Sequence, residues 1–272
     1  MAKNRHTLLL LFLFMLSGAL HAQIKATENS NSEKRTIEIV VHRGANHLAP
    51  ENTVAAAILA LKYGATWIEL DVRSSKDGIL YNLHDETLDR TTNGKGLIRE
   101  TTSQDIDGLD AGSWFNSSYA GAKVPRIAEM LDSLKGKANI FFDVKQGIDV
   151  VKLIALVKEK GYEESSFFWF ADPDMLTNLI QLAPNLRVKV NANNVEGLKK
   201  WMKVCKPSIV ETEPQYITPA FHDFCQKQGI KIMAAIQNGT VENYHQAILT
   251  EPDMVNLDQP ELFEQVLKSF QP

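Results

Sequence analysis

The sequence predicts an α/β fold of the (β/α)₈ class, a TIM barrel with a small insertion after its third strand. Short β-branched runs alternate with helical stretches along most of the 272 residues, and eight of these runs are strand candidates. This alternation indicates a parallel sheet covered by helices, and eight such units are the number that closes a barrel. The length and the 44% hydrophobic content suit one large soluble domain. An open, doubly wound sheet is the alternative fold.

The N-terminus is distinct from this pattern. Lys3 and Arg5 precede an apolar run over residues 8–16, and small residues follow as far as Ala22. This arrangement is typical of a secretory signal peptide, and the run is short for a stable membrane span. We therefore expect a signal peptide over residues 1–22, a flexible lead-in over 23–35 and one barrel domain over 36–272. The protein would then be exported, to the periplasm or the medium; a retained N-terminal anchor is the alternative.

The strand candidates are short apolar runs bounded by polar residues, as buried parallel strands usually are. They occupy residues 37–41, 67–72, 79–83, 139–144, 166–170, 186–190, 208–211 and 230–235. Segments with helical spacing separate or follow them, at residues 52–63, 125–134, 150–158, 173–182, 195–204, 219–228, 241–249 and 262–270. A short apolar segment at 254–257 is interpreted as a turn before the last helix.

The third strand candidate lacks an immediate helix. A polar segment rich in Thr, Asp, Gly and Ser follows it instead, over about residues 85–123. A segment of this length is usually functional or a small inserted subdomain.

Charge and cysteine content exclude some classes of function. The net charge of −4 provides no general basic surface for nucleic acid, so an anionic substrate must be held by local charges or a metal. The two cysteines, Cys205 and Cys225, are not spaced like a zinc site. We interpret them as two buried thiols, with a disulfide as the alternative.

Carboxylates occur near the ends of two predicted strands, where barrel enzymes carry their catalytic groups. Glu69 and Asp71 lie two positions apart on one strand, so both side chains point to the same face. Asp143 lies near the end of the fourth strand candidate and completes an all-oxygen set. Oxygen ligands select a hard cation, so we expect these three residues to hold one Ca²⁺ or Mg²⁺ ion rather than zinc.

Two histidines and two basic residues also lie at the ends of strand candidates: His42 and Arg43 follow the first candidate, His84 follows the third, and Lys145 follows the fourth. His42 and His84 are candidates for general base and general acid because imidazole titrates near neutral pH. Arg43 offers a planar fork for phosphate oxygens, and Lys145 offers a point charge for the same group. Gly44 permits a sharp backbone turn. Together with the carboxylates, these residues predict a metal-assisted site that acts on a phosphate.

The motifs resemble those of the glycerophosphodiester phosphodiesterases, over about residues 39–260. The matching runs are His42-Arg43-Gly44, Pro50-Glu51-Asn52-Thr53, Glu69-Leu70-Asp71-Val72, residues 84–92, Asp143-Val144-Lys145 and Leu257-Asp258-Gln259-Pro260. The resemblance implies an enzyme that hydrolyses small glycerophosphodiesters to glycerol 3-phosphate and an alcohol. It also implies that His42 and His84 are the acid–base pair. Glu69, Asp71 and Asp143 would then bind the cation, and Arg43 and Lys145 would contact the phosphate.

Two departures from the family pattern concern the substrate. Asp143 stands where the family usually has glutamate, and residues 233–238 replace a usual Trp-Thr-Val-Asn run. Aromatic residues Trp114 and Phe115 in the insertion suggest one alternative, a phospholipase D-like enzyme that acts on lysophospholipids. A second alternative is a phosphodiester-binding protein without turnover. Glu51 is expected either to orient a histidine or to begin a helix.

Overall fold

The computed structural model describes residues 36–270, and eight parallel strands in it form a closed barrel, which confirms the predicted fold class. Strand β1 pairs with both β2 and β9, and these two pairings close the sheet on itself. In order around the barrel, the strands are β1 (Glu38–Val41), β2 (Trp67–Ser74), β4 (Asn139–Val144), β5 (Ser166–Phe170), β6 (Arg187–Asn191), β7 (Ile209–Thr212), β8 (Lys231–Ile236) and β9 (Met254–Leu257). The predicted signal peptide and lead-in lie outside the described residues.

Two strand assignments made from the sequence are wrong. Residues 79–83 do not form a barrel strand, because β3 (Leu80–Asn82) pairs antiparallel with the end of β2. The turn between these two strands is far shorter than the dozen or so residues that a parallel crossover needs. Residues 254–257 are not a turn but the eighth barrel strand, β9. An inward-facing asparagine, Asn256, interrupts the apolar pattern of this strand and conceals it in the sequence.

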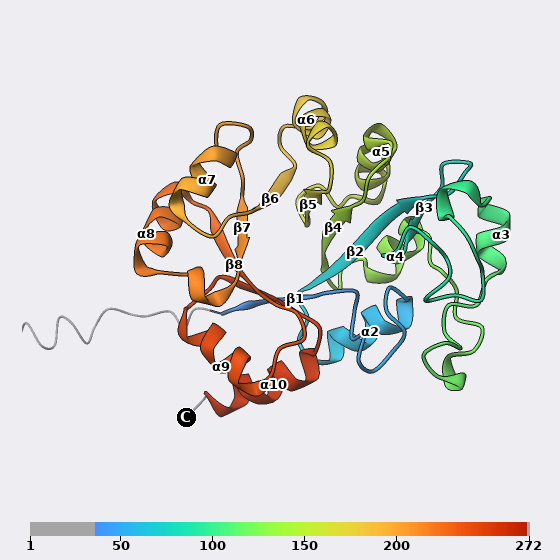
Figure 1. Ribbon diagram of the computed structural model, residues 1–272, viewed down its shortest axis with the longest axis horizontal. Coiled ribbons are helices and arrows are strands. Elements are labelled where there is room, and N and C mark those ends of the chain that lie inside the picture. Colours follow the sequence, from blue (N-terminus) through green and yellow to red (C-terminus); the bar gives the residue numbers. More distant parts are fainter. Residues whose placement is uncertain (1–35, 271–272) are drawn as a thin grey trace, which may run out of the picture. The chain divides into compact units, whose positions relative to one another are not determined.

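Helices surround the barrel (Figure 1). Their apolar faces pack on the outward side chains of the strands, in one large core cluster. The described residues 36–270 contain no helix long and apolar enough to cross a membrane. Cys205 and Cys225 are separate buried thiols, as expected. The helices are α2 (Val54–Lys62), α4 (Ile127–Leu134), α5 (Val150–Lys160), α6 (Pro173–Leu182), α7 (Val195–Trp201), α8 (Pro219–Gln228), α9 (Val241–Leu249) and α10 (Pro260–Ser269), with a 3₁₀ turn, η3 (Pro214–Tyr216), before α8.

The insertion between β2 and β4 has a small core of its own. It contains β3, η1 (Ile98–Glu100), α3 (Ser103–Gly108) and η2 (Ser117–Tyr119). Seven apolar residues pack together beneath it, namely Tyr81, Leu83, Leu88, Ile98, Ile106, Ala111 and Val124. The Tyr81 hydroxyl donates to Asp107 at 2.7 Å and joins this core to α3.

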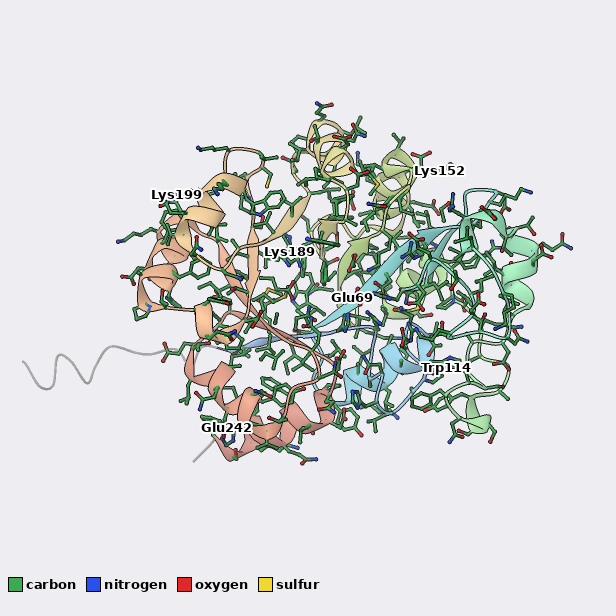
Figure 2. All side chains as sticks on the ribbon, viewed as in Figure 1. Glu69, Trp114, Lys152, Lys189, Lys199 and Glu242 are labelled. Carbon is green, nitrogen blue, oxygen red and sulfur yellow. The ribbon has the colours of Figure 1, made fainter. Side chains whose placement is uncertain are left out.

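The barrel interior changes from apolar to polar along the strands. One apolar layer consists of Val40, Trp67, Phe141, Phe167, Ile209, Met233 and Met254. Residues two positions further along a strand face the same way, so the next layer contains His42, Glu69, Asp143, Trp169, Glu211, Ala235 and Asn256. Lys189 of β6 contacts Glu211 and joins this layer. Figure 2 shows Glu69 and Lys189 near the centre of the ring of strands. The strand period therefore places a polar site directly above an apolar floor.

Candidate active site

The three predicted cation ligands form one cluster. Glu69, Asp71 and Asp143 each offer an oxygen, and these atoms lie within 4.8 Å of one another. Asp71 and Asp143 are register partners on β2 and β4, which explains their proximity. Burial and the neighbouring Asp71 carboxylate raise the pKa of Glu69 to about 8. Burial also raises the pKa of Asp143. Such crowding of buried carboxylates is unfavourable without a cation or a proton.

Unsatisfied oxygen atoms in this cluster fit a hard cation. Glu69 Oε1 and Asp143 Oδ1 are buried and accept no hydrogen bond. Buried carboxylate oxygens without partners are uncommon in proteins, and an all-oxygen set is what Ca²⁺ or Mg²⁺ prefers. The side chains present therefore suit one divalent ion of this kind.

Two cations partly balance the cluster. Lys145 Nζ lies 2.6 Å from Asp71 Oδ1 and 2.9 Å from Asp143 Oδ2. Arg43 Nε lies 3.4 Å from Asp71 Oδ2. Burial would raise the pKa of Asp71, but the charges of Lys145 and Arg43 outweigh it and hold that pKa below its usual value. The two residues predicted to contact phosphate therefore lie directly beside the predicted cation ligands.

The Arg43-Gly44 turn is strained and tightly packed. Arg43 adopts a left-handed backbone with φ of 60°, and its N–H donates to Glu69 Oε2 at 2.9 Å. Gly44 has φ of 77°, and a Cβ there would lie 2.7 Å from the carbonyl carbon of Ala56 in α2. A left-handed conformation costs an ordinary residue about 1–2 kcal/mol. The strained turn directs the Arg43 N–H at the carboxylate cluster, which the relaxed conformation would not do.

Two asparagines that the sequence did not single out support Asp71. Asn52, also left-handed with φ of 60°, donates from Nδ2 to Asp71 Oδ2 at 2.8 Å. Asn82 accepts from the Asp71 N–H at 2.8 Å and donates to the Asn52 carbonyl at 3.0 Å. The next residue, Thr53, caps helix α2. The motif around Asn52 therefore positions a carboxylate as well as starting a helix.

Asp258 lies directly behind His42. Its Oδ1 accepts from His42 Nδ1 at 2.7 Å and from Asn46 Nδ2 at 2.8 Å, and its Oδ2 accepts from the Asn238 N–H at 2.9 Å. A proton on Nδ1 leaves Nε2 as the ring atom that can exchange a proton. Burial lowers the pKa of His42, but the Asp258 hydrogen bond and the Glu69 charge outweigh it, and the pKa is raised. Recognising β9 as a strand would have identified Asp258, which directly follows it.

A chain of ion pairs connects the loops of the two histidines. His84 Nδ1 contacts Asp85 Oδ1 at 2.8 Å, and Arg90 Nε donates to Asp85 Oδ2 at 2.7 Å. Arg90 also donates twice to Glu51, at 2.7 and 2.9 Å. Glu51 accepts from Arg43 Nη1 at 3.2 Å. Glu51 therefore contacts neither histidine directly; it links the Arg43 turn to the loop that carries His84.

The structure brings all seven predicted site residues to one mouth of the barrel. Arg43, which directly follows His42, donates its N–H to Glu69 Oε2. The N–H of Leu83, the residue before His84, donates to the Asp71 carbonyl at 3.0 Å, so both histidine loops adjoin the carboxylate cluster. His42 also lines a cavity of about 460 Å³, together with Phe115 of the insertion. This geometry combines a three-carboxylate cluster, two hydrogen-bonded imidazoles and an open space for a ligand.

A second buried ion pair lies on β6 and β7 and was not predicted. Lys189 of β6 donates to Glu211 of β7, and Asn256 Nδ2 donates to Glu211 Oε1 at 2.7 Å. The Lys189 ammonium also lies 5.3 Å from the ring centroid of Trp169, the β5 register partner of Asp143. No motif in the sequence marks Lys189 or Glu211. Only the period of two along each strand could have indicated that they face inward.

Comparison with known proteins decides the family. The model of the glycerophosphoryl diester phosphodiesterase family matches residues 42–234. The chain belongs to this family. The glycerophosphodiester phosphodiesterase of Caldanaerobacter subterraneus subsp. tengcongensis is 33% identical to it over an alignment of 202 residues, and the match covers 71% of this chain and 83% of that protein. The glycerophosphodiester phosphodiesterase of Bacillus subtilis is 36% identical over an alignment of 205 residues, and the match covers 68% of this chain and 70% of that protein.

Solved structures agree with this assignment. The crystal structure of a glycerophosphodiester phosphodiesterase from Agrobacterium tumefaciens has a TM-score of 0.79 and 39% identity, and the match covers 85% of this chain and all of that one. An Oleispira antarctica phosphodiesterase in complex with sn-glycerol-3-phosphate shares the fold, with a TM-score of 0.76, 23% identity and coverage of 85% and 96%. The resemblance drawn from the motifs is confirmed, and the protein is a phosphodiesterase of this family.

Proposed function

We propose that this enzyme is exported and hydrolyses glycerophosphodiesters to glycerol 3-phosphate and an alcohol, with one divalent cation and with His42 and His84 as acid–base pair. The observation that carries the proposal is a buried three-carboxylate cluster beside two histidines, each hydrogen-bonded at Nδ1 to its own carboxylate. The product in the Oleispira antarctica complex, sn-glycerol-3-phosphate, supports this substrate class. The signal-like segment over residues 1–22 supports export.

Glu69, Asp71 and Asp143 would hold the cation, since their oxygens converge and two of those oxygens accept no hydrogen bond. A bound divalent ion neutralises charge on phosphoryl oxygens. Arg43 and Lys145, which lie beside the same carboxylates, add positive charge where the phosphate would meet the cluster. Preorganised charges of this kind stabilise a transition state without reorganising during the reaction.

The two histidines account for the proton transfers. One imidazole takes the proton of a glycerol hydroxyl as its oxygen bonds to phosphorus, while the other protonates the departing alcohol oxygen as its bond to phosphorus breaks. The cyclic phosphodiester formed in this step is then opened by water, with the two proton transfers reversed. Asp258 and Asp85 hold the rings so that Nε2 of each can exchange the proton.

Hydrolysis assays test this mechanism. The chain from Gln23 should release glycerol 3-phosphate from glycerophosphodiesters with Ca²⁺ or Mg²⁺ and lose activity with a chelator. His42→Ala or His84→Ala should lower kcat by about 10²- to 10⁴-fold. His245→Ala, on the outer helix α9, is the matched control. Full turnover in both histidine variants would contradict the acid–base assignment, and a folded protein that binds but never hydrolyses these esters would indicate a binding protein.

Export is tested on the full-length chain. Expressed in a bacterial host with two membranes, it should appear in the periplasm or medium with a new N-terminus near Gln23, detectable by mass spectrometry of the intact protein. An intact N-terminus on membrane-bound protein would instead indicate a retained anchor.

Apolar residues of the insertion favour a second candidate, hydrolysis of lysophospholipids. Trp114 is 41% exposed and Leu48 is 36% exposed, and Phe115 lines the cavity at His42 (Trp114 is labelled in Figure 2). The Tyr119 hydroxyl donates to the Leu48 carbonyl at 3.0 Å and holds the insertion against the loop of Leu48, so Leu48, Trp114 and Phe115 form one apolar rim. Such a rim could contact an alkyl chain.

Comparing lysophosphatidylcholine with glycerophosphocholine separates the two candidates. If the rim binds an alkyl chain, Trp114→Ala should raise KM for the lysolipid alone, whereas exposed Leu182→Ala on α6 should not. Equal KM values for the lysolipid in wild type and Trp114→Ala would eliminate this role.

A further inference from the structure

A polar groove continues from the His42 cavity over the mouths of β6, β7 and β8, across the barrel from β2. It consists of two cavities of about 570 and about 720 Å³ that share Glu213, Ala235 and Gln237. Gln237 also lines the cavity that contains His42. The groove therefore begins at the proposed catalytic centre, on the side away from the insertion.

Two unpaired side-chain amides line the smaller cavity of the groove. Asn191 ends β6 and Gln237 directly follows β8, and both line the groove. Their side-chain amides make no hydrogen bond with another residue of the described part of the chain. Each amide offers two donors and an acceptor to a ligand. Thr212 and the Glu213 carboxylate add further acceptors along the same wall.

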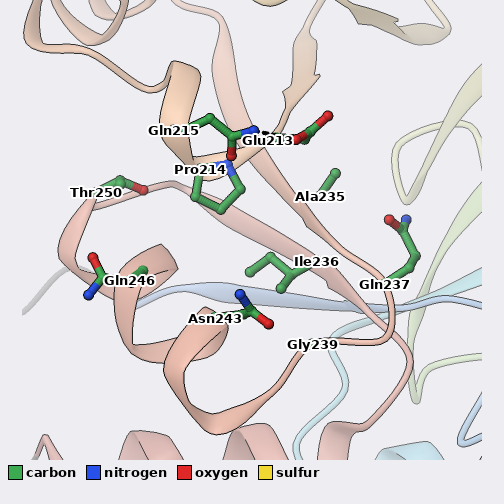
Figure 3. A pocket seen from close by; sticks show the side chains of 10 residues that line it. All are labelled: Glu213, Pro214, Gln215, Ala235, Ile236, Gln237, Gly239, Asn243, Gln246 and Thr250. Atoms are coloured by element: carbon green, nitrogen blue, oxygen red, sulfur yellow. Dashed lines mark hydrogen bonds between the residues drawn. The ribbon is translucent and has the colours of Figure 1, made fainter.

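A small residue joins the two cavities. Ala235 of β8 lies two residues beyond Met233 of the apolar layer and therefore also faces inward, next to β7, which carries Glu211. Figure 3 shows Ala235 and Gln237 at one side of the larger cavity, and Glu213 and Gln215 along its upper edge. A bulky side chain at position 235 would extend into the space that both cavities share. Each of the two cavities is larger than the three-carbon glycerol part of the substrate requires, and each volume falls in the range of ~300–1000 Å³ typical of small-molecule sites.

The chemistry of the lining discriminates between classes of ligand. No lysine or arginine lines either cavity, and Glu213 is acidic, so an anionic group is disfavoured. No aromatic ring lines them, which removes the usual partner of a quaternary ammonium group. An alkyl chain would leave the amides of Asn191 and Gln237 without partners on desolvation. Hydroxyl groups satisfy all of these donors and acceptors.

We propose that this groove binds the alcohol arm of the phosphodiester and selects an uncharged, hydroxyl-rich alcohol through Asn191, Glu213 and Gln237. The inference rests on the proposed glycerophosphodiester hydrolysis. The glycerol arm then lies on the insertion side of the phosphate, in the cavity that His42 and Phe115 line.

Three glycerophosphodiesters that differ only in the alcohol test the inference, namely the inositol, choline and hexanol esters. Wild-type kcat/KM should favour the inositol ester over both others by at least about tenfold, since one or two additional hydrogen bonds correspond to that factor. Asn191→Leu and Gln237→Leu should each reduce the inositol-to-hexanol ratio by about tenfold, and Ala235→Trp should reduce it further. Gln226→Leu, exposed on α8, is the matched control and should keep the wild-type ratio.

The outcomes separate this inference from the proposed function. Hydrolysis of none of the three esters would refute both. Hydrolysis of all three with similar kcat/KM, or a preference for choline or hexanol, would overturn this inference alone. The wild-type comparison needs no variant, so it decides the question even if a substitution prevents folding.

Discussion

Replacing Asp258 with asparagine isolates the contribution of the carboxylate behind His42. Asp258 Oδ1 accepts from His42 Nδ1 at 2.7 Å and from Asn46 at 2.8 Å, in a side chain only 6% exposed. Asparagine keeps the shape but removes the negative charge. Its amide can also present an N–H group where the native site has only acceptors. Asp258 is a positioning residue that acts through the His42 ring.

The expected loss follows from this one contact. A hydrogen bond to a charged group contributes about 1.5–3 kcal/mol, which corresponds to a fall in kcat/KM of about 10- to 150-fold. If the asparagine N–H turns toward the ring, Nδ1 becomes an acceptor and the proton moves to Nε2. The wrong tautomer would then increase the loss toward about 10⁴-fold.

The pH profile gives a second, independent readout. In the native protein burial lowers the pKa of His42, while the bond to Asp258 and the charge of Glu69 raise it above its ordinary value. Removing the Asp258 charge weakens the raising effect and leaves burial unchanged. The limb of the kcat/KM profile that reflects the titration of His42 should therefore move to lower pH.

Steady-state kinetics from pH 5 to 9, at saturating cation, measure both effects. Asp223→Asn, exposed on α8, controls for loss of one negative charge. An Asp258→Asn enzyme within twofold of wild type at every pH, with no displaced limb, would refute the reasoning.

Three further predictions concern the turn, the cluster and the ion-pair chain. At Gly44, φ is 77° and an added Cβ would lie 2.7 Å from the backbone of α2, so Gly44→Ala should lower the free energy of unfolding in urea by at least about 2 kcal/mol. At Gly136, φ is 70° but the space around the residue is open, so Gly136→Ala should lower it by only about 1 kcal/mol. Equal losses in the two variants would contradict the packing argument. Asp143→Asn should weaken Ca²⁺ or Mg²⁺ binding about tenfold or more by calorimetry, because it removes one of three ligand charges, and unchanged affinity would exclude it as a ligand. The Arg90 hydrogen bonds hold the pKa of Asp85 below its ordinary value. They therefore stabilise the folded protein above about pH 4, and this stabilisation is lost as the pH falls through the pKa that Asp85 has in the folded state. The Tm deficit of Arg90→Gln should therefore shrink between pH 7 and pH 3, and a constant deficit would argue against this linkage.

The sequence by itself determined the fold class and the members of the carboxylate cluster. Local periodicity carries this information, because apolar runs of strand length alternate with helical spacing, and a period of two places Glu69 and Asp71 on one face. Parallel strands bring their carboxyl ends to one mouth, so residues at those ends meet however far apart they lie in the chain. Asp143 could therefore be assigned to the same cluster as Asp71.

The tertiary structure decided which strands close the barrel and which side chains support the cluster. Pairing direction distinguishes β3 from β9, and direction depends on partners across the sheet rather than on local composition. Asn82 and Asp258 act on residues 11 and 216 positions away, Asp71 and His42, in contacts that no local pattern encodes. The amide groove likewise exists only where the ends of β6, β7 and β8 meet. Short-range spacing thus determined what the site contains, and long-range packing determined how each member is held.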